Sequence, residues 1–395
     1  MLDLAARIET PKTAEDVVEL VAEVGAAGRT LEIVGGGTKR GIGSNSLKGG
    51  VATDAVLSLV GLSKVIDYAP EELVLTAQPG VTLAALEKLV AAQGQMLPFE
   101  PPQLTRLLGA KGKPTLGGAL AANLSGPRRI RAGAARDHFL GLQAVTGRGE
   151  LIKAGGKVVK NVTGYDLAKL LAGSWGTLAV LTEVTIKVLP AARTEATLLI
   201  FGLPDARANE AMVAAMNAPV EVSGVAHLPL ATARRAPLKG QMAVTAFRLE
   251  GFAASVAVRA EHLAMALKGF GRAERLDADH SREFWMQVRE VEAFARDPRP
   301  LWRLSVPPAA GFRVGEALAG ETLYDWGGGL VWLLSDAEPV HVRAAVRALG
   351  GHATLYRGDG PAFEPLAGPL AALSARVKAA FDPKGVLNPG RMAPF

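Results

Sequence analysis

The sequence predicts an α+β protein with more than one domain. Its 395 residues are enough for two or three domains of about 150 residues each. Hydrophobic residues make up 49% of the chain and charged residues 21%, a composition typical of a globular protein with a large core. Strand-like apolar runs alternate with helical patterns, and the 45 glycines and 24 prolines indicate many tight loops.

The composition also excludes several classes of function. The net charge is +6, but no long basic run is present and only 5% of residues are aromatic, so we expect no nucleic-acid interface. The absence of cysteine excludes disulfides, thiolate zinc sites, cysteinyl-linked cofactors and cysteine-ligated iron–sulfur clusters held by this chain. None of the six histidines forms a His-x-His or His-x-x-x-His pair, so we expect no metal site. No signal-like N-terminus and no apolar run of about 18 residues is present, which predicts a cytoplasmic protein without a transmembrane segment.

A strand that ends in three glycines is the first candidate site. Ile33 and Val34 have the pattern of the end of a buried strand. The glycines at 35–37 lack Cβ atoms, so their amides can crowd around an anion and adopt positive φ. Thr38 adds a hydroxyl donor and Lys39 a positive charge. This is the chemistry of a phosphate cradle, although the pattern also suits a mobile turn, and it matches neither a P-loop nor a Rossmann fingerprint.

The other elements of the N-terminal half follow in order. Thr13 predicts the cap of a first helix, and Thr82 the cap of a second that stops at Gly94. Small residues after Thr115 predict a helix that either packs tightly in the core or allows a flat or anionic ligand to approach its backbone. The strand patterns predict a hairpin-like pair at 65–68 and 73–77, a hairpin at 140–154 and a buried strand at 180–188.

Five sequence blocks occur in a characteristic order: G-G-G-T at 35–38, T-x-G-G-x-x-A-x-N-x-S-G at 115–126, K-N-x-x-G-Y-D-L at 160–167, G-S-x-G-T-L at 173–178 and F-D-P-x-x-x-x-N-P-G-R at 381–391. Together they resemble the FAD-binding domain of the vanillyl-alcohol oxidase and p-cresol methylhydroxylase (PCMH) superfamily. Residues 125–129, 136–138 and 351–355, with the short overall length, further resemble the family of the shorter FAD-binding subunit of bacterial glycolate oxidases. The resemblance implies a two-subdomain PCMH-type FAD-binding domain over residues 1–190, to which residues 376–395 return.

Residues 191–375 have the pattern of a separate α/β cap domain. Strands are predicted at 197–201, 220–225, 242–249, 302–306, 323–326 and 330–334, and helices at 207–216, 252–267, 282–295, 313–318 and 339–348. These two βαβ-like halves suggest paired ferredoxin-like units, the layout of the superfamily's substrate domain.

The resemblance also implies the residues that bind FAD. For the pyrophosphate they are Gly35, Gly36, Gly37, Thr38 and Lys39. For the second phosphate and the flavin edge they are Thr115, Leu116, Gly117 and Gly118, with Asn123 and Gly126 behind them. For the adenine and ribose they are Gly176, Thr177, Leu178 and Val180, and the C-terminal block adds Asn388. Ala179 replaces the usual glycine and Trp175 the usual glutamate. We expect non-covalent FAD, because the glycine loop lacks histidine and the chain lacks cysteine.

Oxidation of a 2-hydroxy acid needs a cation for the carboxylate, a base for the hydroxyl and hydride access to the flavin. Arg128, Arg129 and Arg131 are candidates for the cation, with Arg129 the one retained as a weak catalytic candidate; alternatively, one of them binds an FAD phosphate and the others are solvated. His138 and His352 are weak candidates for the base, because a lone histidine more often has a structural role. The His-x-His metal ligands of the related large subunit have no counterpart in this sequence.

Two functions follow from the resemblance. The first is an FAD-dependent oxidoreductase subunit that transfers hydride from glycolate or a similar 2-hydroxy acid to FAD and passes electrons to a partner. The alternative is a non-catalytic FAD-holding subunit that relays electrons or supports the complex. Either would assemble with a larger FAD subunit and an iron–sulfur subunit, and any association with a membrane would come through these partners.

Overall fold

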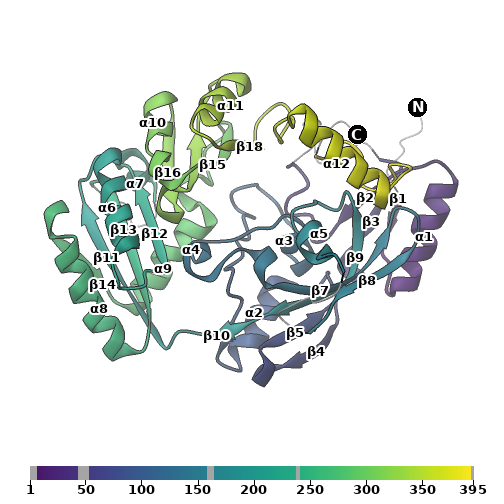
Figure 1. Ribbon diagram of the computed structural model, residues 1–395, viewed down its shortest axis with the longest axis horizontal. Helices are drawn as coiled ribbons and strands as arrows, with labels where there is room; N and C mark the ends of the chain where they lie inside the picture. Colours follow the sequence, from purple (N-terminus) through teal and green to yellow (C-terminus); the bar gives the residue numbers. More distant parts are fainter. Residues whose placement is uncertain (1–6, 43–52, 158–163, 237–240, 393–395) are drawn as a thin grey trace.

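The computed structural model describes residues 7–42, 53–157, 164–236 and 241–392. In Figure 1 an eight-stranded sheet lies on the left, and the elements of the N-terminal half lie on the right together with the last helix. Strands and helices are both abundant and most strand pairs are antiparallel, so the α+β prediction is confirmed. Residues 160–163 of the third sequence block lie outside the described residues. No helix among the residues described is long and apolar enough to cross a membrane.

A small parallel sheet carries the glycine loop. Its strands are, in sheet order, β1 (Arg7–Glu9), β3 (Ala55–Ser58) and β2 (Leu31–Val34). Helix α1 (Ala14–Ala26) begins at Thr13, whose side chain forms a capping box with Asp16. The valines of α1 pack on Leu31 and Leu57 of this sheet. The loop therefore leaves from a strand that its own core holds in place.

A second, antiparallel sheet stands beside the first. Its strands are, in order, β4 (Val65–Ala69), β5 (Val74–Ala77), β9 (Ala179–Lys187), β7 (Phe139–Thr146) and β8 (Leu151–Gly155). The helices of this part are α2 (Leu83–Ala91), α3 (Leu116–Ala121), α4 (Arg129–Ala132) and α5 (Leu167–Leu171). A two-stranded pair, β6 (Gln95–Met96) with β10 (Leu189–Pro190), lies where the chain leaves this part.

The eight-stranded sheet consists of two βαββαβ halves. The first contains β11 (Thr194–Phe201), α6 (Asp205–Asn217), β12 (Gly224–Leu228), α7 (Leu230–Arg235), β13 (Val244–Gly251), α8 (Ala253–Ala266) and β14 (Ala273–Leu276). Helix α9 (Ala278–Glu290) leads to the second, which contains β15 (Leu301–Ser305), α10 (Arg313–Ala317), β16 (Glu321–Asp325), β17 (Leu330–Leu334), α11 (Pro339–Ala348) and β18 (His352–Arg357). The order β14-β11-β13-β12-β16-β17-β15-β18 places two ferredoxin-like sheets edge to edge, as predicted.

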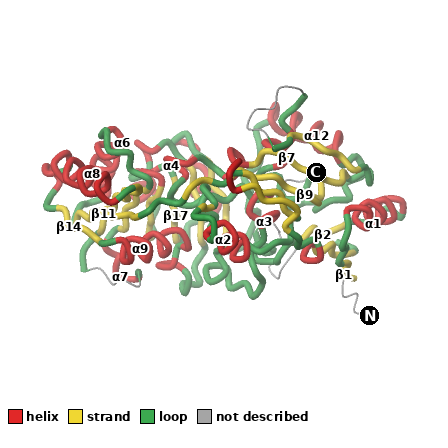
Figure 2. The backbone as a smooth tube through the Cα atoms, turned by 90° about the horizontal axis from the view of Figure 1, so that it is seen from below, coloured by secondary structure: helices red, strands yellow, loops and turns green. Residues whose placement is uncertain are grey.

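The two faces of this sheet have different coverings. Helices α6, α8, α10 and α11 pack on one face, and α7 and α9 pack on the other. Figure 2 shows α6 and α8 above the sheet and α7 and α9 below it. The second face also receives Ile42, Leu104 and Leu107 from the N-terminal half. The cap is therefore joined to the N-terminal half through a shared apolar core.

The C-terminal segment returns to the first sheet after helix α12 (Gly368–Phe381). The amide of Leu31 donates to the Val386 carbonyl at 2.7 Å, and the amide of Asn388 donates to the Leu31 carbonyl at 2.9 Å. The buried Lys378 ammonium donates to the carbonyls of Thr177 and Leu387. The division into independent domains at residues 190 and 375 stays a prediction.

Candidate functional site

A cavity opens at the end of β2, where the glycine loop faces the loop that precedes α3. Two adjoining hollows of about 100 and 590 Å³ share the backbone of Gly35, Gly36 and Gly37. The first is lined by residues from several stretches far apart in the sequence. The predicted residues that the structure brings together in its wall are Gly35, Gly36, Gly37, Thr38, Lys39, Thr115, Gly117, Gly118 and Gly176.

The glycine loop is packed closely against the loop before α3. A Cβ atom at Gly36 would lie 1.6 Å from the Lys113 carbonyl oxygen, and one at Gly35 would lie 2.4 Å from Thr115 Oγ1. Of the three glycines only Gly37 has a positive φ, 71°. The sequence suggested that the glycines serve an anion; in the structure they also allow two loops to touch.

Lys39 is buried beside this loop without a hydrogen-bonded carboxylate. Its ammonium donates to Thr38 Oγ1 at 3.1 Å and to the Gln103 carbonyl at 3.4 Å, and its side chain is 9% exposed. Burial lowers the pKa of Lys39 to about 8, although Glu290 opposes this shift. The Glu290 carboxylate is already bonded to the amides of Gln103 and Leu104. The Lys39 ammonium thus has unused capacity for an anion.

Arg391 reaches the same cavity from the C-terminal return. Its Nη2 donates to the Lys39 carbonyl at 2.8 Å, and its guanidinium lies over the Trp175 ring at 5.5 Å. Burial lowers the pKa of Arg391 to about 10. Arg40 is different, because its Nε donates to the buried Glu32 carboxylate at 2.9 Å. Within the described ranges, neither Arg391 nor Lys39 has a carboxylate within ion-pair distance, although Glu32 and Glu290 lie close enough to raise their respective pKa values. Two buried cations therefore face the cavity without a directly bonded counter-charge.

Helix α3 forms the opposite wall from small residues. The Thr115 hydroxyl caps it by accepting from the Gly118 amide at 3.3 Å. A Cβ at Gly117 would lie 2.5 Å from the Pro79 Cβ, so only glycine lets α3 approach Pro79 this closely. Gly118, Ala121 and Ala122 line the cavity, and none has a side chain larger than a methyl group. This wall is shaped to accept a flat or elongated group.

The remaining predicted FAD residues lie outside the cavity wall, and their contacts with FAD stay predictions. Asn388 supports the wall: its side-chain amide donates to the Trp175 carbonyl and accepts from the Ile33 amide, both at 2.8 Å. Asn123 accepts from the Arg136 amide at 3.0 Å. The others are in the core or in turns behind the wall: Leu116, Gly126, Thr177, Leu178 and Val180.

Several residues of the wall were not among the predicted site residues: Arg40, Leu59, Pro79, Ala121, Ala122, Trp175, Ala179, Leu181 and Arg391. Two of them, Trp175 and Ala179, are the positions at which the sequence departs from the superfamily. Arg391 is the last residue of the C-terminal block, so the match to that block was the sequence signal that could have identified it as a site residue.

The three arginines after Gly126 have different surroundings. Arg128 is nearly buried and pairs with Glu250 at 2.8 Å and with Glu100 at 3.2 Å. Arg131 is exposed and pairs with Glu221 at 2.9 Å. Arg129 is half-buried, and no hydrogen bond or ion pair joins its guanidinium to the rest of the described chain. Of the three, Arg129 alone keeps its charge available for a ligand.

The two candidate histidines lie in different places. His138 donates from Nε2 to the Ala132 carbonyl at 2.7 Å, and its buried Nδ1 has no partner among the residues described. Burial lowers the pKa of His138, and its ring stacks on Phe99. His352 is at the start of β18 with much of its surface open to solvent, and partial desolvation of its ring together with the charge of Arg303 lowers its pKa. A catalytic role for either one stays a prediction.

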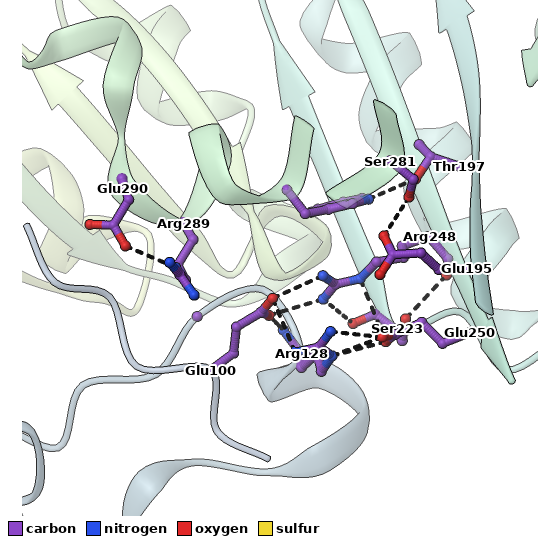
Figure 3. A network of polar contacts seen from close by, with 12 residues as sticks. Glu100, Arg128, Glu195, Thr197, Ser223, Arg248, Glu250, Ser281, Arg289 and Glu290 are labelled. Atoms are coloured by element: carbon purple, nitrogen blue, oxygen red, sulfur yellow. Dashed lines mark hydrogen bonds and ion pairs between the residues drawn. The ribbon is translucent and has the colours of Figure 1, made fainter. Parts of the chain in front are cut away.

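A buried ionic network joins the N-terminal half to the cap (Figure 3). Arg248 of β13 donates from both Nη atoms to the Glu100 carboxylate at 3.0 Å. Arg128 bridges Glu100 to Glu250. On the cap side, Glu195 accepts from the Ser281 hydroxyl at 2.6 Å. Arg128 and Arg248 therefore each contact Glu100 of the N-terminal half and Glu250 of the cap.

Asp325 at the end of β16 is a buried carboxyl group that the sequence did not single out. It is 3% exposed, and its Oδ1 accepts from the Trp326 amide at 2.7 Å. Burial is the main cause that raises the pKa of Asp325 to about 7. The folded protein therefore keeps a proton that the unfolded chain loses near its ordinary pKa of 3.8, so stability falls as the pH rises from about 4 to 7.

Asp325→Asn is expected to stabilise the protein at pH 8 by about 2–4 kcal/mol and to have little effect at pH 4, because the amide keeps the acceptor for Trp326 without a buried charge. Thermal unfolding at pH values between 4 and 8 measures this. An unchanged dependence of the melting temperature on pH in the variant would show that Asp325 is ionised in the folded protein throughout this range.

Comparison with known proteins adds two kinds of similarity. Residues 5–155 match the family model described as "FAD binding domain". The chain is 36% identical over 355 residues to the glycolate oxidase subunit GlcE of Escherichia coli (strain K12), covering 89% of this chain and 91% of that protein. It is also 35% identical over 162 residues to the glycolate oxidase subunit GlcD of Bacillus subtilis (strain 168), covering 40% of this chain and 33% of that protein.

Among solved structures, the chain is similar to p-cresol methylhydroxylase with a TM-score of 0.70 at 16% identity, covering 98% of this chain and 88% of that one. It is similar to 4-ethylphenol oxidase from Gulosibacter chungangensis with a TM-score of 0.71 at 15% identity, covering 98% and 89%. At these identities the likeness shows the fold, and the predicted PCMH-type fold is confirmed.

Proposed function

Because this chain belongs to the family of the glycolate oxidase subunit GlcE and carries an FAD-binding domain, we propose that it is the FAD-binding subunit of a complex that oxidises glycolate or a similar 2-hydroxy acid. FAD is its cofactor, and it is an FAD-linked oxidoreductase by family. The observation that carries the proposal is the pair of buried cations, Lys39 and Arg391, that face a glycine-lined cavity without a carboxylate partner among the described residues.

The residues of the cavity fit the pyrophosphate of FAD. Lys39 and Arg391 supply positive charge, the glycine loop supplies backbone amides, and Gly118, Ala121 and Ala122 leave room beside helix α3. When bound, FAD supplies an acceptor for the hydride of the 2-hydroxy acid. The chain then has to bind the substrate's carboxylate, exclude water and accept the hydroxyl proton.

The proposed oxidation of a 2-hydroxy acid can be tested on the FAD-loaded chain without oxygen. Glycolate should bleach the visible absorption of the oxidised flavin, because two electrons pass from the substrate to FAD. A chain that stays oxidised with glycolate alone but is reduced when the partner subunits are added would support the alternative, a non-catalytic subunit that holds FAD for relay.

FAD is expected to be held non-covalently. Acid precipitation of the purified yellow protein should leave intact FAD in the supernatant, because no cysteine is present and no histidine lies in the cavity wall among the described residues. Chromatography of the supernatant identifies the flavin. Colour that remains with the precipitated chain would contradict non-covalent binding, and FMN in place of FAD would contradict a cavity built for a dinucleotide.

Electrons that reach FAD must leave the chain, and a chain without cysteine cannot hold cysteine-ligated iron–sulfur centres. We therefore propose a complex with a larger FAD subunit and a cysteine-rich iron–sulfur subunit. Co-expression with those subunits, size-exclusion chromatography and glycolate-dependent dye reduction test this. Turnover of glycolate by the isolated chain at about 10 s⁻¹, a typical enzyme rate, would show that no partner is needed.

A further inference from the structure

Two arginines from different parts of the chain lie over one tryptophan ring. The guanidinium carbon of Arg129 in α4 is 4.5 Å from the centre of the Trp326 ring, and that of Arg303 in β15 is 5.1 Å from it. Both arginines are half-buried, and neither guanidinium donates a hydrogen bond or forms an ion pair within the described part of the chain. The charge of Arg303 lowers the pKa of Arg129, so the two cations repel each other, and an anion bound to both would relieve the repulsion.

Two hydrogen bonds and a constrained backbone conformation fix Trp326 in this position. Its indole Nε1 donates to the Gly126 carbonyl at 3.0 Å, and its amide donates to Asp325 at 2.7 Å. Its backbone has a φ of 54°, in the left-handed region, at the tight turn between β16 and β17. A rigid ring that holds two guanidiniums by cation–π contact orients them before any ligand arrives.

The cluster formed by Arg129, Arg303 and Trp326 lies at the junction between the FAD-binding part and the cap. Ala122 lines the FAD cavity, and Gly126, which holds the Trp326 indole, follows four residues later, at most about 14 Å away along an extended chain. Arg303 comes from the opposite side, on the face of the cap sheet that also carries Trp332 and Tyr356. The cluster thus combines a residue beside the FAD-binding wall with one from the cap.

Neighbouring groups do not neutralise the two arginines. Burial lowers the pKa of Arg129, and the charges of Arg303 and Arg136 lower it further, while Asp137 opposes them from outside ion-pair distance. Asp325 is close enough to sense Arg303, but burial raises its pKa to about 7, so much of it is protonated at neutral pH. The local field at the cluster is therefore positive.

We propose that Arg129 and Arg303, held on Trp326, bind the carboxylate of the substrate. This inference rests on the proposed oxidation of a 2-hydroxy acid, and it deepens it by assigning the substrate's carboxylate to named residues. A planar guanidinium binds a carboxylate through two parallel hydrogen bonds, and two guanidiniums from opposite sides of the junction fix its orientation. The FAD phosphates do not compete for this pair, because Lys39 and Arg391 face the FAD cavity and neither Arg129 nor Arg303 lines its described wall.

The test uses oxalate, a carboxylate that cannot donate a hydride, on the FAD-loaded full-length chain. Oxalate binding is followed by the change in the visible flavin spectrum and by calorimetry, with ethylene glycol as the ligand that lacks a carboxylate. We expect Arg129→Met and Arg303→Met each to weaken oxalate binding by about tenfold to a hundredfold, the usual effect of losing a charge-assisted contact. Arg303→Lys should lose less, because it keeps the charge without the planar fork.

Arg313→Met is the matched control. Arg313 is an exposed arginine of the cap that lies over the Phe312 ring at 5.7 Å, and its loss should leave oxalate binding unchanged. Bound FAD and the melting temperature are measured for every variant, so that weak binding of oxalate is not confused with unfolding. Wild-type affinity for oxalate in both methionine variants would overturn the proposal, and so would a wild-type protein that glycolate reduces but that does not bind oxalate.

These outcomes are distinct from those that test the proposed function. Arginine-dependent oxalate binding in a chain that glycolate never reduces would support the carboxylate site and count against catalysis by this subunit. Glycolate reduction with an unchanged KM in both methionine variants would support catalysis and overturn the carboxylate site.

Discussion

An apo-protein that is more stable than the wild type and yet binds FAD more weakly is the expected result of Lys39→Met. The Lys39 ammonium is buried, and its hydrogen bonds go only to neutral oxygens of Thr38 and Gln103. Its pKa is lowered by burial from 10.5 to about 8, so holding its charge at pH 7 costs up to about 3 kcal/mol without FAD. Methionine has a similar length and no charge, so we expect the apo-protein to gain about 1–3 kcal/mol.

The same substitution removes a charge-assisted contact to the FAD pyrophosphate. We expect FAD affinity to fall by about tenfold to a hundredfold. Thermal unfolding without FAD and a fluorescence titration with FAD measure the two effects separately. Because the folded-state pKa of Lys39 lies below its unfolded value, the stability gain should be largest below pH 8 and disappear as the pH rises toward 10.5.

Arg40→Met is the contrasting control for Lys39→Met. Arg40 lies next in the sequence but is paired with Glu32, whose side chain is 1% exposed. Its loss leaves a buried carboxylate alone, so this variant should be less stable than the wild type. A Lys39→Met protein that is destabilised to the same extent, or that binds FAD as tightly as the wild type, would show that Lys39 is a structural cation.

Elements with strong local signals were predictable from the sequence. The bounds of β17 and α11 agree with the predicted 330–334 and 339–348, and Thr13 and Thr82 cap the helices that they were predicted to cap. The two cap strands that were missed, β14 and β18, are the fourth strands of the two ferredoxin-like halves and lie at the two edges of the sheet. Edge strands pair on one side only, and β14 has no buried residue, so it lacked the apolar run on which strand prediction depends.

The candidate site was predictable where a single loop carries it and not where distant segments meet. The glycine loop is visible in the sequence because its residues are consecutive. Arg391 contacts Lys39 across 352 residues, and no local pattern reports that contact. Likewise, the sequence does not distinguish Arg128, Arg129 and Arg131. In the structure the cap supplies Glu250 as a partner for Arg128 and Glu221 as a partner for Arg131, and within the described residues it supplies no carboxylate that pairs with Arg129.

Arg248→Met is expected to lower the free energy of unfolding by about 3–5 kcal/mol at pH 7, the usual loss when one partner of a buried ion pair is removed. Arg248 is 1% exposed and Glu100 is 8% exposed, and the substitution leaves Glu100 with Arg128 as its closest remaining cation. The guanidinium of Arg248 also lies over the Trp285 ring at 4.7 Å, so tryptophan fluorescence during urea unfolding reports on this region. Arg282→Met, which removes an exposed pair with Asp279 on α9, is the matched control and should change stability by less than about 0.5 kcal/mol.

The pH dependence of this loss distinguishes an ionic cause from a packing cause. Burial alone would raise the pKa of Glu100, but Arg248 and Arg128 hold it at about 2. Stability from this lowered pKa is present above the ordinary value of 4.5 and is lost as the pH falls toward 2. The gap between wild type and Arg248→Met should therefore narrow in acid, and Glu100→Gln in the Arg248→Met background should recover part of the loss at pH 7. A gap that is the same at every pH, with no recovery in the double variant, would mean that Arg248 stabilises the junction by filling space rather than by charge.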